Sequence, residues 1–460
     1  MTIAHALASF VVKTSYDDIP QSTRSHLKTR VLDSLGCAIG ALGRAPVKLV
    51  RDQIEDFGGK EHCTLIGGGR TSPDRAAFYN SALVRYLDFN DSYLAKNETC
   101  HPSDNLGAVL AASEYAGTSG RDFLTALAVA YQVQCRLSEV APVRSKGFDH
   151  TTQGSYAVAA GVSKALGMSA DRIANAVALS GTAFNALRVT RTGALSHWKG
   201  LAYPNTAFGC THAAFLAMRG ITGPPEVFEG NKGFMDSIAG PFRIEWSEEA
   251  IDRIDLTIIK RFNAEIHSQS AIEGVLELKA LHGFCGDDIA GIEIETFDVA
   301  FNIIGGGEEG DKTIVHTKEE ADHSLQYMVA VAVLDGQVMP EQYSPERIRR
   351  PDVQGLLKKV TVRPRKSFSA GFPGAMPCLL RVHLTNGGVL TREKKDYEGF
   401  HTNPMPWERV AEKFRRLSSP FADASLQQEI EQAVYGLDEI DILDLVGTLA
   451  RVRADVDLKR

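Results

Sequence analysis

The sequence predicts a mainly α-helical protein with a smaller α+β domain inserted into it. Helical patterns fill the first half of the chain, strand patterns begin near residue 255, and helical patterns return after residue 402. The segment with strands has about 140 residues, a usual domain size. We therefore expect a helical domain at 1–256, an α+β domain at 257–401, and helices at 402–460 that complete the helical domain.

Apolar residues at helical spacing predict the helices of the first half. Leu27, Val31, Leu35 and Ile39 form one face of a helix. Ser72 and Pro73 fit an N-cap and the first helical position of another. The segments 120–140 and 169–187 are apolar around most of their circumference, which indicates buried helices, and only "CTLIGGG" from residue 63 suggests a strand there.

In the second half, β-branched and alternating residues predict strands. The expected strands are "IDLTIIK" (254–260), "IAGIEIETF" (289–297), "KKVTVRP" (358–364), and a pair joined at Asn386-Gly387, a strong hairpin signal. Helices are expected at 270–281 and 407–417, and "TKEE" at 317–320 fits a capping box that begins a helix running to residue 336. "GGGEEGDKT" (305–313) departs from the phosphate-loop spacing, so we interpret it as a plain loop.

Charge and cysteine usage exclude several classes of protein. The net charge of −7 and a pI near 6.0 argue against nucleic-acid binding. The sequence shows neither a signal peptide nor an apolar run long enough to cross a membrane, so we expect a cytoplasmic protein without a membrane partner. The seven cysteines are widely spaced, which favours reduced thiols and argues against an iron–sulfur cluster or a zinc site held by them.

One polar stretch, "YLDFNDSYLAKNETCHPSDN" at 86–105, suggests acid–base chemistry. Asp88 and Asp91 precede His101, which stands just before an apolar helix, where free backbone N–H groups attract anions. The alternative is an ordinary polar loop, with the aspartates as caps and the histidine in solvent.

Two lysines are candidates for binding an anion. Lys199 has Arg191 nearby in sequence, and Lys260 precedes His267 at the expected domain junction. Either lysine could instead be an ordinary solvated one. Tyr327 lies on an apolar helix, where a core tyrosine with a tethered hydroxyl is the common alternative.

Four blocks resemble the MmgE/PrpD family: "YLDFND…HPSDNLGAVLA", "LSHWKGLA", "AEIHSQSAIEG" and "DHSLQYMVAVAVLDG". The family includes 2-methylcitrate dehydratase, cis-aconitate decarboxylase and iminodisuccinate epimerase. The resemblance implies a large helical domain with an α+β lid, a homodimer, and catalysis without a cofactor. It also implies a small di- or tricarboxylate substrate.

By the same resemblance, the catalytic residues are Asp91, His101, Lys199, Lys260 and Tyr327. Arg191, His267 and Ser103 are expected to bind substrate. Decarboxylase-like members carry a histidine where this chain has Glu265, and most members carry proline in place of Asn263.

The expected function is a cofactor-independent hydro-lyase acting on 2-methylcitrate or a similar hydroxy-polycarboxylate. Such a reaction needs a base for an acidified C–H proton, cations for the carboxylates, and an acid for the leaving hydroxyl. We expect Asp91 to fix the tautomer of His101. The alternatives are a decarboxylase or epimerase of the same family, or a non-catalytic helical protein that binds an anionic metabolite.

Overall fold

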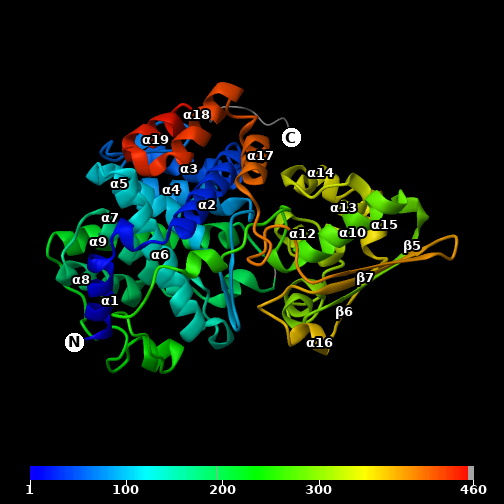
Figure 1. The fold of residues 1–460 in the computed structure, drawn as a ribbon, viewed down its shortest axis with the longest axis horizontal. Helices are drawn as coiled ribbons and strands as arrows, with labels where there is room; N and C mark the ends of the chain where they lie inside the picture. Colours follow the sequence, from blue (N-terminus) through cyan, green and yellow to red (C-terminus); the bar gives the residue numbers. More distant parts are fainter. Residues whose placement is uncertain (194, 454–460) are drawn as a thin grey trace. The chain divides into compact units, whose positions relative to one another are not determined.

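The computed structural model describes residues 1–193 and 195–453, which form two compact units (Figure 1). Among the described residues, unit 1 contains Met1–Thr190, Gly200–Thr257 and residues 406–453. Unit 2 contains Ile258–Met405 and the short segment Arg191–Lys199. The structure confirms that the protein is mainly helical with a small sheet region, as the sequence predicts.

Unit 1 is built from helices. They are α1 (Ile3–Lys13), α2 (Gln21–Gly40), α3 (Ala45–Phe57), α4 (Pro73–Tyr86), α5 (Leu106–Ala116), α6 (Gly120–Val140), α7 (Thr151–Ala165), α8 (Ala170–Ala183), α9 (Trp198–Met218, whose first two residues group with unit 2), α17 (Trp407–Ser418), α18 (Ala424–Tyr435) and α19 (Ile442–Ala450). No described helix is long and apolar enough to span a membrane.

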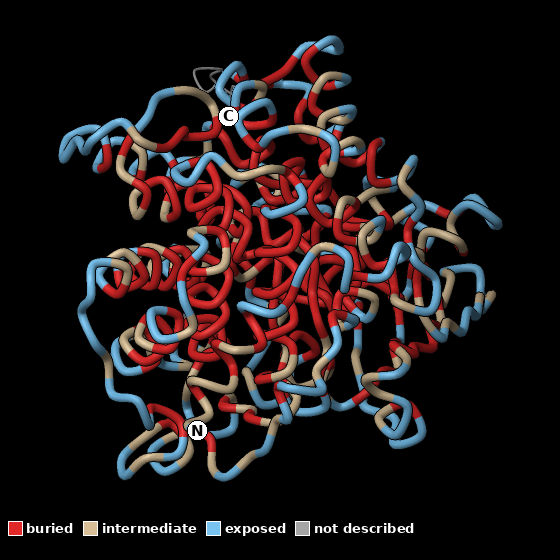
Figure 2. Tube along the Cα trace, turned by 60° about the vertical axis from the view of Figure 1, so that its left-hand side comes forward, coloured by how far each residue is buried: buried red, intermediate tan, exposed pale blue. Residues whose placement is uncertain are grey.

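The prediction of a buried helix at 120–140 is confirmed by α6, but the same prediction for 169–187 is wrong in part, because α8 ends at Ala183 and buries only one side. In α5, the residues from Leu106 to Glu114 are all buried, and α6 and α7 are nearly so. Figure 2 shows such stretches as long, uninterrupted buried segments of the trace. Ser72 and Pro73 stand at the start of α4 as predicted.

Two short hairpins interrupt the helices of unit 1. β1 (Cys63–Thr64) pairs with β2 (Arg70–Thr71), and β3 (Tyr93–Ala95) pairs with β4 (Glu98–Cys100). The sequence suggests strand β1 but gives no indication of the β3–β4 hairpin. That hairpin lies inside the polar stretch and brings its two ends, near Asp91 and His101, together.

Helix α17, the first helix after unit 2, packs on α2, so segments far apart in sequence lie side by side (Figure 1). A methyl group at Gly36 of α2 would stand 3.1 Å from the Phe414 backbone, so glycine permits this close approach. Lys413 of α17 forms a buried ion pair with Asp33 of α2 at 2.7 Å. Its ammonium also donates to the Phe89 carbonyl at 2.8 Å.

We expect Lys413→Met to lower the free energy of unfolding by about 3–5 kcal/mol, because it leaves the Asp33 carboxylate buried without its partner. The control is Arg415→Met on the same helix, which removes a half-exposed pair with Glu431 and is expected to cost less than about 1 kcal/mol. Urea unfolding of both variants measures the difference. Equal losses would show that the buried pair contributes no more than the exposed one.

Unit 2 contains a four-stranded mixed sheet in the order β6-β5-β7-β8. The strands are β5 (Ile289–Thr296), β6 (Val360–Pro364), β7 (Cys378–Leu384) and β8 (Val389–Lys394). β5 runs parallel to β6 and antiparallel to β7, and β7 and β8 form a hairpin. The turn contains Asn386-Gly387, as predicted, with Gly387 at φ 87°, a conformation that favours glycine.

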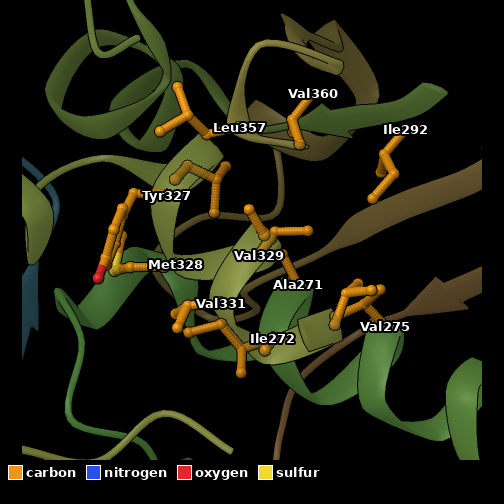
Figure 3. Close-up of a cluster of buried hydrophobic side chains, with 14 of the residues drawn as sticks. Ala271, Ile272, Val275, Ile292, Tyr327, Met328, Val329, Val331, Leu357 and Val360 are labelled. Atoms are coloured by element: carbon orange, nitrogen blue, oxygen red, sulfur yellow. The ribbon is translucent and has the colours of Figure 1, made fainter. Parts of the chain in front are cut away.

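The helices of unit 2 are α10 (Gln269–His282), α11 (Asp298–Ala300), α12 (Lys318–Ala321), α13 (Leu325–Asp335), α14 (Pro345–Ile348), α15 (Pro351–Leu357) and α16 (Lys366–Ser369). α10 and α13 contribute to an apolar core with the sheet (Figure 3). Ile272, Val275 and Val329 in this core come from the two helices, and Ile292 comes from β5.

Two predictions for the second half of the chain are wrong in detail. Residues 254–260 form a short 3-10 turn, Arg253–Leu256, followed by extended chain rather than a named strand. The capping box at Thr317 is present, but it starts only the short α12, and Ser324 caps a separate helix, α13. The break between these two helices leaves Asp322 and His323 outside regular helix.

Candidate functional site

Asp91 lies at the centre of a buried hydrogen-bond network in unit 1. Its side chain is 0% exposed, and one carboxylate oxygen accepts from the Ser103 N–H at 3.1 Å and the Ser103 hydroxyl at 2.6 Å. The other oxygen accepts from the Tyr131 hydroxyl at 2.8 Å. Burial raises the pKa of Asp91, while these hydrogen bonds and the nearby charge of Arg30 oppose the rise. The backbone N–H and the hydroxyl of Ser103 therefore both bind the Asp91 carboxylate.

His101 is held by the backbone of Asp91. Its Nδ1 lies 2.8 Å from the Asp91 carbonyl and 3.0 Å from the Ser92 hydroxyl oxygen. A carbonyl oxygen can only accept, so Nδ1 carries the proton and Nε2 of the neutral ring is the basic nitrogen. Asp91 thus orients His101 as expected, but through its main-chain carbonyl and not through its carboxylate.

The polar loop around Asp91 is buried, and an ion pair and hydrogen bonds fix its conformation. Asp88 adopts a left-handed conformation with φ 55°, which is uncommon for a residue other than glycine. Its carboxylate pairs with Arg85 at 2.6 Å, and the Asn90 amide donates to the Ser103 hydroxyl at 2.8 Å. Since Asp88, Asp91 and His101 are all buried, the alternative of a solvated loop with an exposed histidine does not hold.

A second histidine, His150, stands beside His101. The two ring centroids are 5.4 Å apart, and His150 Nε2 lies 3.6 Å from a carboxylate oxygen of Asp149. His150 immediately precedes α7. Sequence analysis missed this residue, although "DHTTQG" shares one signal with the His101 stretch, namely a histidine placed directly before a buried helix.

In unit 2, Lys199 forms a charged group with Asp322 and His323. Lys199 Nζ lies 2.8 Å from the Asp322 carboxylate and 2.9 Å from His323 Nδ1, and that nitrogen lies 2.7 Å from the same carboxylate. Burial would raise the pKa of Asp322, but Lys199, Lys318 and His323 hold it far below its usual range. Asp322 therefore stays ionised and fixes the ammonium of Lys199.

Arg191 lies next to this group. One of its guanidinium nitrogens donates to the Lys199 carbonyl at 2.7 Å, and the side chain is buried. In this position Arg191 supports the backbone at the start of α9. Its predicted contact with substrate stays a prediction.

Glu265 and His267 form a buried acid–imidazole pair. His267 Nδ1 lies 2.6 Å from one Glu265 oxygen, and the other oxygen accepts from the His267 N–H at 2.7 Å. Burial would raise the pKa of Glu265, but the charge and hydrogen bond of His267, followed by His323 and Lys260, lower it to about 2. His267 Nε2 is buried and meets no hydrogen-bond partner among the described residues, which suits the predicted role in binding substrate.

Lys260 is almost fully buried, with 1% of its surface exposed, and its charge acts on Glu265. The chain before it is fixed by the Ile259 N–H, which donates to the Gly399 carbonyl at 2.9 Å. The chain after it is fixed by the Asn263 N–H, which donates to the Val338 carbonyl at 2.9 Å. A proline at position 263 could not make this second bond, so asparagine here adds a backbone anchor.

Tyr327 lies in the apolar core of unit 2 (Figure 3). Its side chain is 0% exposed, and its hydroxyl donates to the Gln342 carbonyl. Burial raises its pKa. This geometry resembles the alternative of a core tyrosine with a tethered hydroxyl, and the catalytic role expected for Tyr327 stays a prediction.

None of the seven cysteines, all of which the structure describes, forms a disulfide, and Cys285 is the exposed one among them. Within either unit taken alone, no three described His, Cys, Asp or Glu side chains come close enough together to hold one metal ion. The expectation of catalysis without a metal or cofactor stays a prediction.

The structure thus defines a helical protein with two buried groups of acid–base and charged side chains, one in each unit, as in an enzyme that acts on small anionic molecules. Residues 5–247 match the MmgE/PrpD N-terminal domain, and residues 262–439 match the MmgE/PrpD C-terminal domain. The chain belongs to the MmgE/PrpD family.

Similar proteins of known activity cover most of the chain. A 2-methylcitrate dehydratase of Cupriavidus necator is 31% identical over 80% of this chain and 79% of its own length. A mitochondrial 2-methylcitrate dehydratase of Yarrowia lipolytica is 27% identical over 90% of this chain and 84% of its own. The cis-aconitate decarboxylase of Mus musculus is 25% identical over 92% of this chain and 88% of its own. The chain is an enzyme of the lyase class that these relatives represent.

Proposed function

We propose that the enzyme is a hydro-lyase that removes water from 2-methylcitrate or a closely similar hydroxy-polycarboxylate. The observation that carries the proposal is the orientation of His101, whose Nδ1 donates to the Asp91 carbonyl at 2.8 Å and whose Nε2 is thereby left as a base. The two dehydratase relatives support the substrate class.

In the proposed reaction, His101 Nε2 takes a proton from the carbon next to a substrate carboxylate. The C–H electron pair becomes the new carbon–carbon double bond, and the C–O bond breaks at the neighbouring carbon. The leaving hydroxyl departs as water after it accepts a proton. His150, whose ring centroid lies 5.4 Å from that of His101 in the same unit, is a group able to supply that proton. In unit 2, Lys199 and Lys260 are cations of the kind that bind carboxylates.

Decarboxylation of cis-aconitate is the second candidate, because the mouse decarboxylase matches almost the whole chain. One feature of the chain disfavours it. The glutamate at position 265 forms a tight pair with His267, whereas decarboxylase-like members carry a histidine there.

The test is incubation of the purified enzyme with 2-methylcitrate, citrate, cis-aconitate and iminodisuccinate. We expect 2-methylcitrate to develop the ultraviolet absorbance of a double bond conjugated to a carboxylate, with no release of CO2. CO2 from cis-aconitate would favour the decarboxylase, and a change in optical rotation alone would favour an epimerase. No reaction with any of the four acids would refute the proposal.

A further inference from the structure

Tyr203 on α9 lies between the two segments that carry His101 and His150. Its side chain is 0% exposed. Its hydroxyl oxygen lies 3.0 Å from the side-chain oxygen of Asn105 and 3.0 Å from that of Gln134 in α6. Its ring lies next to the ring of His150, with centroids 6.1 Å apart and planes 26° apart. Burial raises the pKa of the Tyr203 hydroxyl well above its usual value, so the hydroxyl keeps its proton and acts as a hydrogen-bond donor.

The hydroxyl side of Tyr203 leads to His101. The Asn105 amide donates to the Pro102 carbonyl at 2.9 Å and to the Gln134 side-chain oxygen at 2.7 Å. Pro102 directly follows His101 and starts a 3-10 turn that ends at Asn105. The Tyr203 hydroxyl therefore belongs to a hydrogen-bond network that fixes the turn next to His101.

The ring side of Tyr203 packs on α7. Gly154 follows His150 by four residues, and its N–H donates to the His150 carbonyl at 3.2 Å, so both residues lie on one face of the helix. A methyl group at Gly154 would stand 2.4 Å from a ring carbon of Tyr203. Glycine is unfavourable inside a helix, but here it admits the Tyr203 ring to the face that carries His150.

The separation of His101 and His150 decides how well the two groups can serve one substrate. Their ring centroids are 5.4 Å apart. A displacement of about 1 Å in such a site can cost roughly 10²-fold in rate. Tyr203 contacts the His150 ring directly and the His101 segment through Asn105, and so it links the two sides of this pair.

We propose that Tyr203 is a positioning residue that sets the separation of His101 and His150. Its ring orients His150, and its hydroxyl fixes the turn after His101. This inference rests on the proposed function, which it extends with a residue that acts only through the two histidines.

The test compares Tyr203→Phe and Tyr203→Leu with the same two substitutions at Tyr156 in α7. Tyr156 is the matched control because it is also 0% exposed and packs against the rings of Phe228 and Phe234, at centroid distances of 4.5 and 5.2 Å. Steady-state kinetics on 2-methylcitrate give kcat and KM, and urea unfolding gives the stability of each variant.

We expect kcat to fall by about 10-fold in Tyr203→Phe, which keeps the ring, and by about 10²-fold in Tyr203→Leu, which loses both contacts. KM should change by less than about 2-fold, because a positioning residue acts on the reaction step and not on substrate binding. Tyr156→Leu should lose comparable stability but keep kcat within about 2-fold of the wild type. An equal fall of kcat in the Tyr156 variants would mean that Tyr203 contributes ordinary packing, and would overturn the inference.

A second measurement does not depend on turnover. The histidine ring C–H signals in the NMR spectrum of the resting enzyme are assigned with His101→Asn and His150→Gln. We expect Tyr203→Leu to shift the signals of both histidines, and Tyr156→Leu to leave them in place. Tyr203→Phe, which keeps the packing, should shift the His101 signal alone, and it decides the question if the leucine variant does not fold.

Unmoved signals of His101 and His150 in the Tyr203 variants would overturn the inference and leave the proposed function standing. If the wild type did not turn over 2-methylcitrate, the proposed function would fail. The NMR shifts would then still decide whether Tyr203 positions the two histidines.

Discussion

Replacing His101 by asparagine is expected to lower kcat by about 10²–10⁴-fold, the usual contribution of a positioned acid–base group. Asparagine suits the test because its amide N–H can replace the Nδ1–H bond to the Asp91 carbonyl, observed at 2.8 Å, while it offers no basic nitrogen. The fold should therefore survive and the proton transfer should not. Turnover of 2-methylcitrate is the measurement, with circular dichroism as the folding control.

His101→Ala separates the two functions of the side chain. It removes the bond to the Asp91 carbonyl as well as the base, so we expect it to lose stability that the asparagine variant keeps. Near-normal turnover in either variant would mean that His101 takes no part in the reaction, and that the buried network around Asp91 is purely structural.

Replacing Lys260 by methionine is expected to lower kcat/KM by roughly 10- to 150-fold, which corresponds to the loss of about 1.5–3 kcal/mol for a charged hydrogen bond. KM should rise and kcat should fall, because this ammonium would serve both the ground state and the transition state. Methionine keeps most of the apolar stem of a side chain that is only 1% exposed.

Steady-state kinetics on 2-methylcitrate provide the measurement, and Lys260→Arg is the matched variant because it keeps the charge. We expect the arginine variant to recover part of the affinity lost in the methionine variant. If KM stayed unchanged in Lys260→Met, the lysine would have no role in holding substrate.

Much of the fold could be predicted from the sequence because its helices are long and their apolar residues recur regularly. Buried helices such as α6 are apolar on nearly all sides, and the hairpin at Asn386-Gly387 carries its own turn signal. Short or interrupted elements could not be predicted. The β3–β4 hairpin has only three residues in each strand, which is too short for alternation to give a signal.

The break between α12 and α13 illustrates a different limit. The capping box at Thr317 and the apolar residues after Ser324 together resemble one continuous helix, yet the chain leaves helical geometry at Asp322–Ser324. Ser324 caps the second helix, and the break leaves Asp322 in contact with Lys199, which is 123 residues away in sequence. Local patterns do not encode such a pair.

Some residues of the candidate site could be predicted from the sequence, and others could not. Asp91 and His101 could be identified because they share one polar stretch before a buried helix, but the use of the Asp91 carbonyl depends on the hairpin that joins them. His150 belongs to another segment, and its position 5.4 Å from the His101 ring follows from helix packing alone.

The measurement that tests the central claim most directly is proton NMR of 2-methylcitrate in heavy water with the wild type and His101→Asn. The account predicts that the wild type forms the alkene and incorporates deuterium at the carbon next to the carboxylate in recovered substrate. It predicts that the asparagine variant does neither at a comparable rate. Equal alkene formation and deuterium exchange in the two proteins would contradict proton abstraction by His101, and a wild type that forms no alkene would contradict the proposed reaction itself.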